Sequence, residues 1–319
     1  MGQFADQIIA WQQVHGRHDL PWQHTREAYR VWLSEIMLQQ TQVATVIPYY
    51  QRFVGRFPDV NVLAEAPIED VMSHWAGLGY YSRARNLHEC ARRVVRDHGG
   101  AFPSDVDALA SLPGIGRSTA GAIAALAFGQ RAAILEGNVK RVLARHFGLL
   151  GYPGTPSVER DLWQRANALL PVGQIGTYTQ GLMDLGATLC TRARPKCGVC
   201  PLAETCVALR EQMTGVLPTP RPVKQRPTRT AIVLVLRDQS GSVLLEQRPS
   251  VGIWGGLLSL LEFDASASAA EIAAAVHRRY GLRIAVHESL GEVRHQFTHF
   301  SYVMHPRLAR CAGAAGASS

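Results

Sequence analysis

Hydrophobic residues recur three and four positions apart through most of the first part of the chain. This spacing places them on one face of a helix, and it predicts helices over most of residues 1–110 and again over 158–170 and 178–189. Proline and glycine interrupt the pattern, because both disfavour the continuation of a helix. The breaks lie at Leu20-Pro21, at Phe57-Pro58 and at the pair Gly77 and Gly79.

The pattern changes near residue 216. Residues 216–229 are rich in proline and basic side chains, which is typical of an extended, semi-rigid linker. Two short β-like runs follow, at 231–236 and 243–245, separated by a turn at Ser240-Gly241. Residues 269–280 return to helical spacing.

These changes predict two domains, and 319 residues are enough for each to bury a core of its own. The expected fold is an all-α domain over 1–215 and a smaller α+β domain over 230–307, joined by the linker. We expect residues 308–319 to form a disordered tail.

A helical hairpin is predicted around residues 112–128. Pro113 ends the incoming helix, and Gly114 and Gly116 allow positive φ and a close approach of the backbone. Ser118 lies near the start of the next helix, whose free N–H groups are a natural seat for a phosphate. The hairpin therefore either grips a nucleic-acid backbone without reading its sequence or simply packs two helices, and spacing alone does not separate these alternatives.

Four of the six cysteines fall within residues 190–206. In a chain with the composition of a cytoplasmic protein, this density favours a metal centre over disulfides. Zinc and a [4Fe–4S] cluster both accept four thiolates, so the spacing leaves the metal open. The candidate ligands are Cys190, Cys197, Cys200 and Cys206.

Charge and hydropathy narrow the class of partner. The formal net charge of +8 favours a polyanion. No apolar run approaches the roughly 20 residues of a membrane span, so a cytoplasmic location is expected. Residues 77–85 combine glycines, aromatic side chains and two arginines, which suits a nucleic-acid groove as well as an ordinary loop.

Taken together, these stretches resemble the adenine DNA glycosylases, which remove adenine mispaired with 8-oxoguanine. That family belongs to the helix-hairpin-helix superfamily of endonuclease III. The matching stretches are Leu20-Pro21-Trp22, Ser34-Glu35 through Val43, Gly77 through Arg85, Leu112 through Ala120, Gly137 through Arg141 and the four cysteines. Trp254 through Leu257 and Phe297 through Phe300 resemble the family's Nudix-like domain, which reads 8-oxoguanine.

The resemblance implies a monofunctional enzyme of base excision repair. It would be a six-helix barrel with a [4Fe–4S] lobe, joined to the Nudix-like domain. Its partner would be double-stranded DNA containing 8-oxoguanine:A or G:A mismatches. We expect a monomer in the bacterial cytoplasm, associated with the nucleoid and with no membrane.

The resemblance also assigns site residues. Glu35 matches the proton donor to the adenine ring, and a pocket that excludes water would keep this carboxyl protonated near neutrality. Gln40 would wedge into the space left by a flipped adenine, a step that costs a few kcal/mol. The adenine pocket would include Leu20, Trp22, Leu38 and Gln180. Contacts to DNA and to the lesion would come from Gln40, Thr41, Leu78, Tyr80, Gly114, Gly116, Phe297, Thr298 and His299.

The second catalytic carboxylate departs from the family pattern. The family has Asp before Gly-Asn-Val-Lys-Arg, where it stabilises the sugar cation, and here that residue is Glu136, two before Asn138. Glu adds one methylene, about 1.5 Å of chain, and a misplacement on the order of 1 Å can cost about a hundredfold in rate. The expectation is an active or slowed enzyme, and the alternative is a catalytically impaired lesion-binding protein.

Two further positions bear on the activity. Relatives that also cut the strand carry Lys at the position of Ser118, and serine cannot form the Schiff base that they use. Ser118 and the appended second domain also disfavour a third hypothesis, a thymine-glycol or mismatched-thymine glycosylase of the same superfamily. The Nudix-like domain lacks the metal-binding glutamates of a hydrolase, since Ala275, Arg278 and Arg279 stand in their places. The family usually continues beyond Pro306 with more strand and a helix, which predicts an incomplete domain or a diverged tail.

Overall fold

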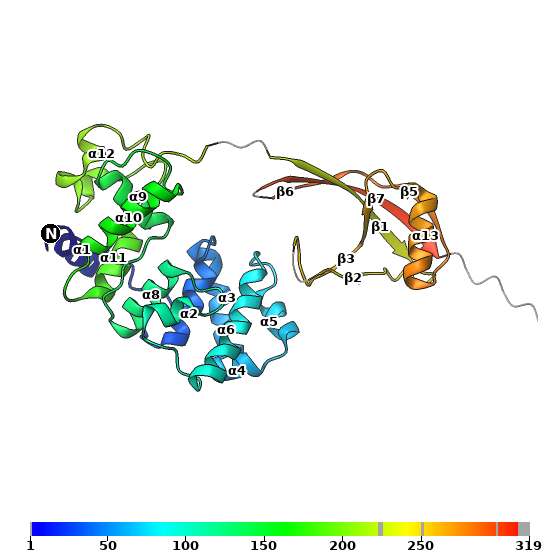
Figure 1. The fold of residues 1–319 in the computed structure, drawn as a ribbon, viewed down its shortest axis with the longest axis horizontal. Helices are drawn as coiled ribbons and strands as arrows, with labels where there is room; N and C mark the ends of the chain where they lie inside the picture. Colours follow the sequence, from blue (N-terminus) through cyan, green and yellow to red (C-terminus); the bar gives the residue numbers. More distant parts are fainter. Residues whose placement is uncertain (1, 223–225, 250–251, 298, 312–319) are drawn as a thin grey trace, which may run out of the picture. The chain divides into compact units, whose positions relative to one another are not determined.

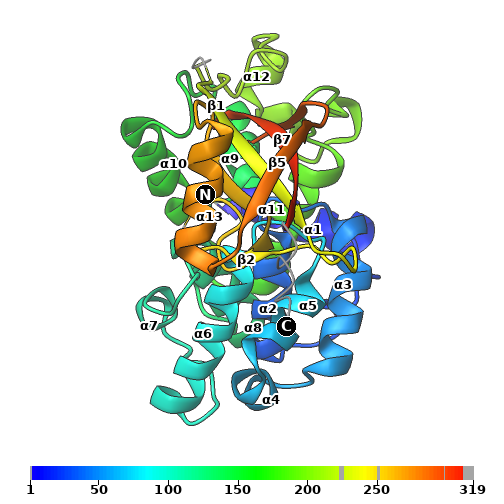
Figure 2. The ribbon, with the colours of Figure 1, turned by 90° about the vertical axis from the view of Figure 1, so that its right-hand side faces the viewer.

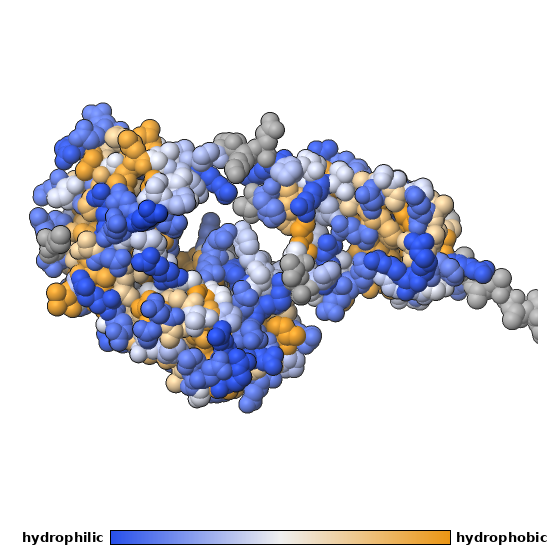
Figure 3. All heavy atoms as spheres, viewed as in Figure 1, coloured by the Kyte–Doolittle hydropathy of each residue, from blue (hydrophilic) through white to orange (hydrophobic). Residues whose placement is uncertain are grey.

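The chain folds into two compact units, residues 1–222 and residues 223–319. The structure, a computed structural model, describes residues 2–222, 226–249, 252–297 and 299–311. Hydrophilic residues cover most of the visible face of each unit, with hydrophobic residues in smaller groups between them (Figure 3). None of the helices among the described residues combines the length and the apolar character needed to cross a bilayer.

The first unit is helical (Figure 1). Its α-helices are α1 Gly2–His15, α2 Ala28–Leu38, α3 Val43–Arg56, α4 Val60–Glu65, α5 Ile68–Trp75, α6 Ser82–His98, α7 Val106–Ala110, α8 Arg117–Phe128, α9 Gly137–His146, α10 Pro156–Ala168, α11 Ile175–Thr188 and α12 Val207–Arg210. Two short 3-10 helices, Cys197–Val199 and Ala203–Thr205, lie among the cysteines. The helices α1, α3 and α5 end before the breaks that the hydrophobic pattern predicts.

The helical unit has two lobes with separate cores. The first lobe packs the inner faces of α2 to α8 around large side chains that include Trp32, Phe53 and Trp75. The second lobe packs α1 against α9, α10 and α11, and includes Ile8 and Tyr178. Figure 1 shows α1 beside α11, although the two helices stand at opposite ends of this unit's sequence. Residues far apart in the chain, such as Gln12, Glu35 and Gln180, therefore line one cavity.

Helix α8 belongs to both lobes. Ala120, Ile123 and Ala124 pack in the first core, and Ala122 and Ala125 pack in the second. Small residues on both faces let neighbouring backbone approach closely. A side chain at Gly121 would meet the carbonyl oxygen of Ala133 at 2.3 Å, so the segment that leads to Glu136 lies directly on this helix.

The second unit contains a mixed five-stranded sheet of order β4-β1-β7-β5, with β6 also pairing with β7. Strand β1 runs parallel to β7 and antiparallel to β4. Two further short strands, β2 and β3, pair with each other. The strands are β1 Thr228–Arg237, β2 Glu246–Gln247, β3 Leu258–Ser259, β4 Leu261–Asp264, β5 Ile284–Ser289, β6 Val293–Gln296 and β7 Ser301–Cys311.

One face of this sheet is covered by helix α13, Ala269–Tyr280, which has the bounds that the sequence predicts. Ser268 and Glu271 form a capping box at its start, and Gly281 adopts the left-handed conformation at its end. Ile272 and Val276 pack against alternate residues of β1. Figure 2 shows the helix beside the strands.

Three details of the second unit differ from the expectations. Leu308 to Cys311 are ordered in β7, because β7 pairs with β1 on one side and with β5 on the other; residues 312–319 lie outside the described residues. Residues 243–245 form no strand of their own, and Val243 only makes an isolated bridge with Arg237. The linker is shorter than expected at both ends, since Leu217 is buried against the helical unit and Thr228 already begins β1.

Candidate active site between the two helical lobes

Glu35 lies near the end of α2 and faces a cavity of about 740 Å³. The cavity opens between the lobes, because its walls include α2 and α8 on one side and α11 on the other. Burial raises the pKa of the Glu35 carboxyl to about 7, and the charge of Glu136 adds to this effect. The side chain can therefore hold a proton near neutral pH.

Glu136 is the N-cap of α9. Its carboxylate accepts hydrogen bonds from the backbone N–H groups of Asn138 at 2.7 Å and Val139 at 2.9 Å. Burial raises the pKa of Glu136, while these two hydrogen bonds and the charge of Arg141 act in the opposite direction. Glutamate is not among the preferred N-cap residues, and the sequence alone did not indicate this capping role.

Ser118 holds the segment that carries Glu136. Its hydroxyl oxygen accepts a hydrogen bond from the backbone N–H of Leu135 at 2.9 Å. Because Ser118 stands in the first turn of α8, this bond connects the helical hairpin to the residue before the candidate carboxylate. Ser118 and Glu136 are not among the residues that line the cavity of about 740 Å³, and the Ser118 hydroxyl contacts the backbone.

Of the four residues expected at the adenine pocket, Trp22 and Gln180 line the cavity together with Glu35. Leu20 and Leu38 are not among the residues that line it; Leu20 belongs to the core of the first lobe, and Leu38 packs against that core. Gln180 is oriented by a contact that sequence reasoning missed. Its amide donates to Asp184 at 3.0 Å, and Asp184 is fully buried.

Asp184 is satisfied by Arg17, which reaches it from the segment after α1. The backbone N–H and the guanidinium of Arg17 both donate to its carboxylate, at 3.0 and 2.7 Å. A buried carboxylate requires such a partner. The sequence signal was a lone aspartate in the apolar face of α11, four positions after Gln180.

Asn138 is also held by an arginine. Arg141 donates to the Asn138 side-chain oxygen, to the Gly186 carbonyl and to the Cys190 carbonyl, each at 2.6 Å. Gly186 lies so close to Asn138 that an added Cβ would stand 2.5 Å from the Asn138 Cβ. The start of α9 is therefore fixed against α11 and against the first of the clustered cysteines.

The residues expected to contact the opposite base lie on two loops. Gln40 and Tyr80 are both exposed, and both have positive φ, 59° and 49°. Thr41 is half-buried, and Leu78 is buried. Positive φ is uncommon outside glycine, so each exposed side chain stands on a locally strained turn.

The hairpin glycines differ from each other. Gly114 has φ +78°, and a Cβ there would meet the Asn86 Cβ at 2.9 Å. Gly116 has φ −87° and ψ 169° and serves as the N-cap of α8. The expectation of positive φ at both glycines is thus wrong for Gly116, which adopts an extended conformation open to any residue.

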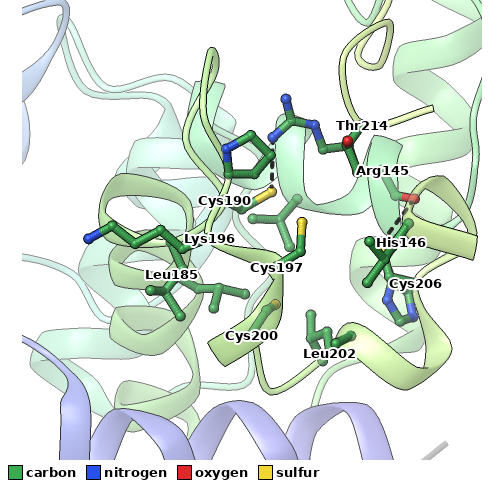
Figure 4. A pocket seen from close by; sticks show the side chains of 15 residues that line it. Arg145, His146, Leu185, Cys190, Lys196, Cys197, Cys200, Leu202, Cys206 and Thr214 are labelled. Atoms are coloured by element: carbon green, nitrogen blue, oxygen red, sulfur yellow. Dashed lines mark hydrogen bonds between the residues drawn. The ribbon is translucent and has the colours of Figure 1, made fainter. Parts of the chain in front are cut away.

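The four clustered cysteines are free thiols that line one cavity, with Arg145, His146 and Leu202 around them (Figure 4). Arg145 anchors their loop, donating to the carbonyls of Thr191 and Arg192 and to that of Leu217. Within the described part of the chain, no three His, Cys, Asp or Glu side chains converge as ligands of one metal ion.

In the second unit, Phe297 and His299 lie in the turn between β6 and β7. The backbone N–H of Phe297 donates to the carbonyl of Phe300, which closes the turn. Phe297 stacks on Phe300 with ring centroids 4.7 Å apart and also contacts Trp254. His299 is exposed, and Thr298 lies outside the described residues. Phe297 and Phe300 therefore join the antiparallel strands β6 and β7.

Comparisons with known proteins agree with this architecture. Residues 33–168 match the HhH-GPD superfamily of base excision DNA repair proteins, and residues 232–318 match the NUDIX domain. The adenine DNA glycosylase of Buchnera aphidicola subsp. Schizaphis graminum is 36% identical over 96% of this chain and 87% of its own length. The human adenine DNA glycosylase is 36% identical over 93% of this chain and 65% of its own length.

Solved structures resemble the chain over about the length of its helical unit. A thermostable thymine-DNA glycosylase is similar with a TM-score of 0.60 and 32% identity, over 65% of this chain and 95% of that one. Endonuclease III in a non-covalent complex with DNA has a TM-score of 0.55 at 22% identity, over 66% of this chain and 95% of that one. At 22% identity, the likeness to endonuclease III shows a shared fold alone.

Proposed function

Because the chain belongs to the adenine DNA glycosylases, hydrolases of the N-glycosidic bond that act in base excision repair, we propose that it removes adenine mispaired with 8-oxoguanine or guanine. The observation that carries this proposal is the environment of Glu35. Its carboxyl faces a cavity of about 740 Å³, within the usual range of ligand pockets, and its pKa is raised to about 7. A proton donor that works at neutral pH requires both features.

Adenine must first leave the duplex. The target atoms are inaccessible in a stacked base pair, so the nucleotide is flipped out at a cost of a few kcal/mol. In the proposed complex Gln40 fills the vacated space, while Thr41, Leu78 and Tyr80 contact the opposite base. Gly114, Gly116 and the start of α8 hold the backbone phosphates.

In the proposed reaction, Glu35 donates its proton to a ring nitrogen of adenine. The bond between the base and the sugar then breaks, and its electron pair leaves with adenine. Glu136 stays ionised and stabilises the positive sugar that remains, and water adds to that carbon and releases a proton. This division between an acid and a charge stabiliser is the usual one in glycoside hydrolysis. Asn138, fixed by Arg141, would border the same sugar.

Gln180 and Trp22 are proposed to hold the adenine. Gln180 offers an amide that can both donate and accept, and Asp184 fixes its orientation. Trp22 is buried and lines the same cavity, so its ring supplies an apolar surface. Leu20 and Leu38 would act on adenine binding only indirectly, by packing in and against the core that supports the residues lining the cavity.

The four clustered cysteines are proposed to hold a [4Fe–4S] cluster. Free thiols around one cavity suit a tetrathiolate centre. The choice of this cluster over zinc rests on the resemblance to the glycosylase family, since both centres accept four thiolates. When bound, the cluster would hold the loop that carries Arg192, Arg194 and Lys196, which are available to DNA phosphates.

Ser118 supports a monofunctional reaction. A serine cannot form a Schiff base, and its hydroxyl is already bound to the Leu135 backbone. The product would be an abasic site in an intact strand. A covalent adduct trapped by borohydride would contradict this part of the proposal.

One observation favours a second candidate, a lesion-binding protein with little catalysis. Both carboxylate oxygens of Glu136 already cap α9, and the side chain is one methylene longer than the family's aspartate. Tight binding to an 8-oxoguanine:A duplex without base release would support this alternative.

The test is single-turnover release of adenine from an 8-oxoguanine:A duplex, with enzyme in excess. We expect release by the unmodified protein and near-complete loss with Glu35→Gln, which keeps the shape but cannot donate the proton. Glu65→Gln, on an exposed residue of the first lobe, is the matched control. A G:T duplex tests for thymine release, and release from that substrate alone would contradict the assignment to adenine.

A further inference from the structure

Arg83 is a buried cation in the second position of α6, only 8% exposed. Its guanidinium lies over the rings of Trp75 and Tyr80, at 5.3 and 5.5 Å from their centroids. Burial lowers the pKa of Arg83 to about 10, so the side chain stays charged at neutral pH despite the cost of removing it from water. Among the described residues no carboxylate pairs with it by a salt bridge, so its charge is compensated by carbonyl oxygens and aromatic faces.

The first set of contacts runs to the end of α2. The Nη1 group lies within hydrogen-bond distance of the carbonyl oxygens of Ile36, Met37 and Gln39, at 3.0, 2.8 and 2.7 Å. Carbonyls at a helix C-terminus lack partners within the helix and carry partial negative charge. Arg83 therefore acts as a cap for α2, immediately before the loop of residues 39–42, which we call the Gln40 loop.

The second set of contacts runs to residues 76–81, which we call the Tyr80 loop. The Nη2 group reaches the carbonyl oxygens of Leu78 at 3.4 Å and Gly79 at 3.3 Å. It also donates to the Thr41 hydroxyl at 3.1 Å, so a single nitrogen contacts both loops. Trp75 donates to the Gly79 carbonyl as well. One side chain thus joins two segments that lie about 40 residues apart in the sequence.

Each loop presents one exposed side chain in a strained conformation. Gln40 and Tyr80 have φ of 59° and 49°, and Tyr80 is 49% exposed. A non-glycine residue keeps such a φ only where its surroundings determine it. Those surroundings include Arg83, which contacts the carbonyls directly before both residues, Gln39 and Gly79.

We propose that Arg83 is a positioning residue that locks the Gln40 loop and the Tyr80 loop into one rigid element for reading the base opposite adenine. The inference rests on the proposed function, which assigns Gln40 as the wedge and Tyr80 as a contact to the opposite base. If the Gln40 loop is already ordered, the Gln40 side chain can enter the DNA duplex without first ordering its loop, so less binding free energy is lost to conformational entropy.

The planar fork of arginine suits this task better than lysine does. Arg83 contacts acceptors on two loops with two nitrogens at fixed geometry, whereas an ammonium is a single point with three donors. Arg83→Lys should therefore retain contact with one loop at a time. Arg83→Met keeps most of the apolar stem and removes every donor.

The test compares Arg83→Met and Arg83→Lys with Val94→Ala, a truncation of a buried side chain eleven residues further along the same helix. Hydrogen exchange measures backbone order in both loops of the free protein. Equilibrium binding measures the preference for an 8-oxoguanine:A duplex over an undamaged duplex. The adenosine in the lesion duplex carries a fluorine on its sugar, which destabilises the sugar cation and so prevents cleavage during the measurement.

We expect Arg83→Met to speed exchange in both loops together and to reduce the binding preference by about tenfold or more, with Arg83→Lys intermediate. Val94→Ala should lower the melting temperature and leave both readouts unchanged. Unchanged loop exchange and unchanged preference in Arg83→Met would overturn the proposal, as would a change of equal size in Val94→Ala.

The outcome also separates this inference from the proposed function. A protein that prefers the lesion duplex but releases no adenine contradicts the proposed reaction, and the Arg83 comparison can still be read from binding. Normal adenine release with an unchanged preference in Arg83→Met overturns the Arg83 proposal alone. If the unmodified protein shows no preference for the lesion duplex, the two loops do not recognise the base opposite adenine, and this proposal is overturned as well.

Discussion

Burial raises the pKa of Glu35 to about 7, and the charge of Glu136 contributes to that shift. The two carboxyl groups come from different elements, since Glu35 stands in α2 and Glu136 caps α9. Two acids with unequal surroundings can divide the work of glycoside cleavage, one as a proton donor and one as an ionised stabiliser. Burial raises the pKa of both carboxyl groups, but Glu136 accepts two backbone hydrogen bonds that oppose the rise, and among the described residues Glu35 has no such bond.

This arrangement should reduce stability at alkaline pH. The pKa of Glu35 is 4.5 in its ordinary state and about 7 in the folded protein, so the folded state disfavours ionisation. The carboxyl is neutral in both states at low pH, and above about pH 7 its burial costs up to about 3 kcal/mol. Glu35→Gln should therefore raise the melting temperature of the helical unit at about pH 8 and change it little near pH 4. Thermal unfolding checks this, with Glu65→Gln as the control, and equal effects at both pH values would contradict it.

Shortening Glu136 should accelerate the reaction. Aspartate is a preferred N-cap, so Glu136→Asp should keep α9 capped and leave the unfolding free energy nearly unchanged. Moving the carboxylate back by one methylene restores the length that the family uses, and we expect adenine release to rise on the order of ten- to a hundredfold. Single-turnover rates measure the change, with Glu136→Gln as the variant that keeps the length and removes the charge. A slower Glu136→Asp would indicate that the surrounding residues have adapted to glutamate.

The close contact between α9 and α11 should be essential for both stability and adenine release. In Gly186→Ala the new Cβ would stand 2.5 Å from the Asn138 Cβ, so the start of α9 must shift. We expect a loss of about 1–3 kcal/mol in stability and a clear fall in adenine release. Gly55→Ala, in α3 and away from the cavity, is the control, because an added Cβ there would meet no atom within 4 Å. Similar effects of the two substitutions would contradict the assigned role of the Asn138 contact.

The turn between β6 and β7 should affect lesion preference. His299 is exposed, so His299→Ala should leave stability unchanged and reduce the preference for 8-oxoguanine over guanine opposite adenine. Phe297 packs against Phe300 and Trp254, so Phe297→Ala should also destabilise the second unit. Comparing release from 8-oxoguanine:A and G:A duplexes measures the preference. An unchanged ratio in His299→Ala would leave the turn with a structural role only.

Much of the fold follows from local sequence signals. Helical periodicity predicts α13 with its observed bounds, and proline and glycine follow the ends of α1, α3 and α5. The long strand β7 was missed because pairing with β1 and β5 stabilises it. Such long-range pairing leaves no local signal in its last residues, Leu308-Ala309-Arg310-Cys311, which were expected to be disordered.

The site was predictable in part. Family resemblance pointed to Glu35, Trp22 and Gln180, which the structure places on one cavity. It did not reveal the residues that orient these side chains and loops by hydrogen bonds, such as Asp184, Arg17 and Arg83. Their roles come from hydrogen bonds between segments distant in sequence, and periodicity cannot indicate these partners.

The pH dependence of single-turnover adenine release tests the central claim most directly, because only a protonated Glu35 can donate. With the pKa of Glu35 at about 7, the rate of the unmodified protein should fall about tenfold per pH unit above that value. Glu35→Gln should be nearly inactive at every pH, while Glu65→Gln should follow the unmodified profile. A rate that stays level from about pH 6 to about pH 9, or a Glu35→Gln variant that keeps its rate, would contradict the assignment of Glu35 as the acid.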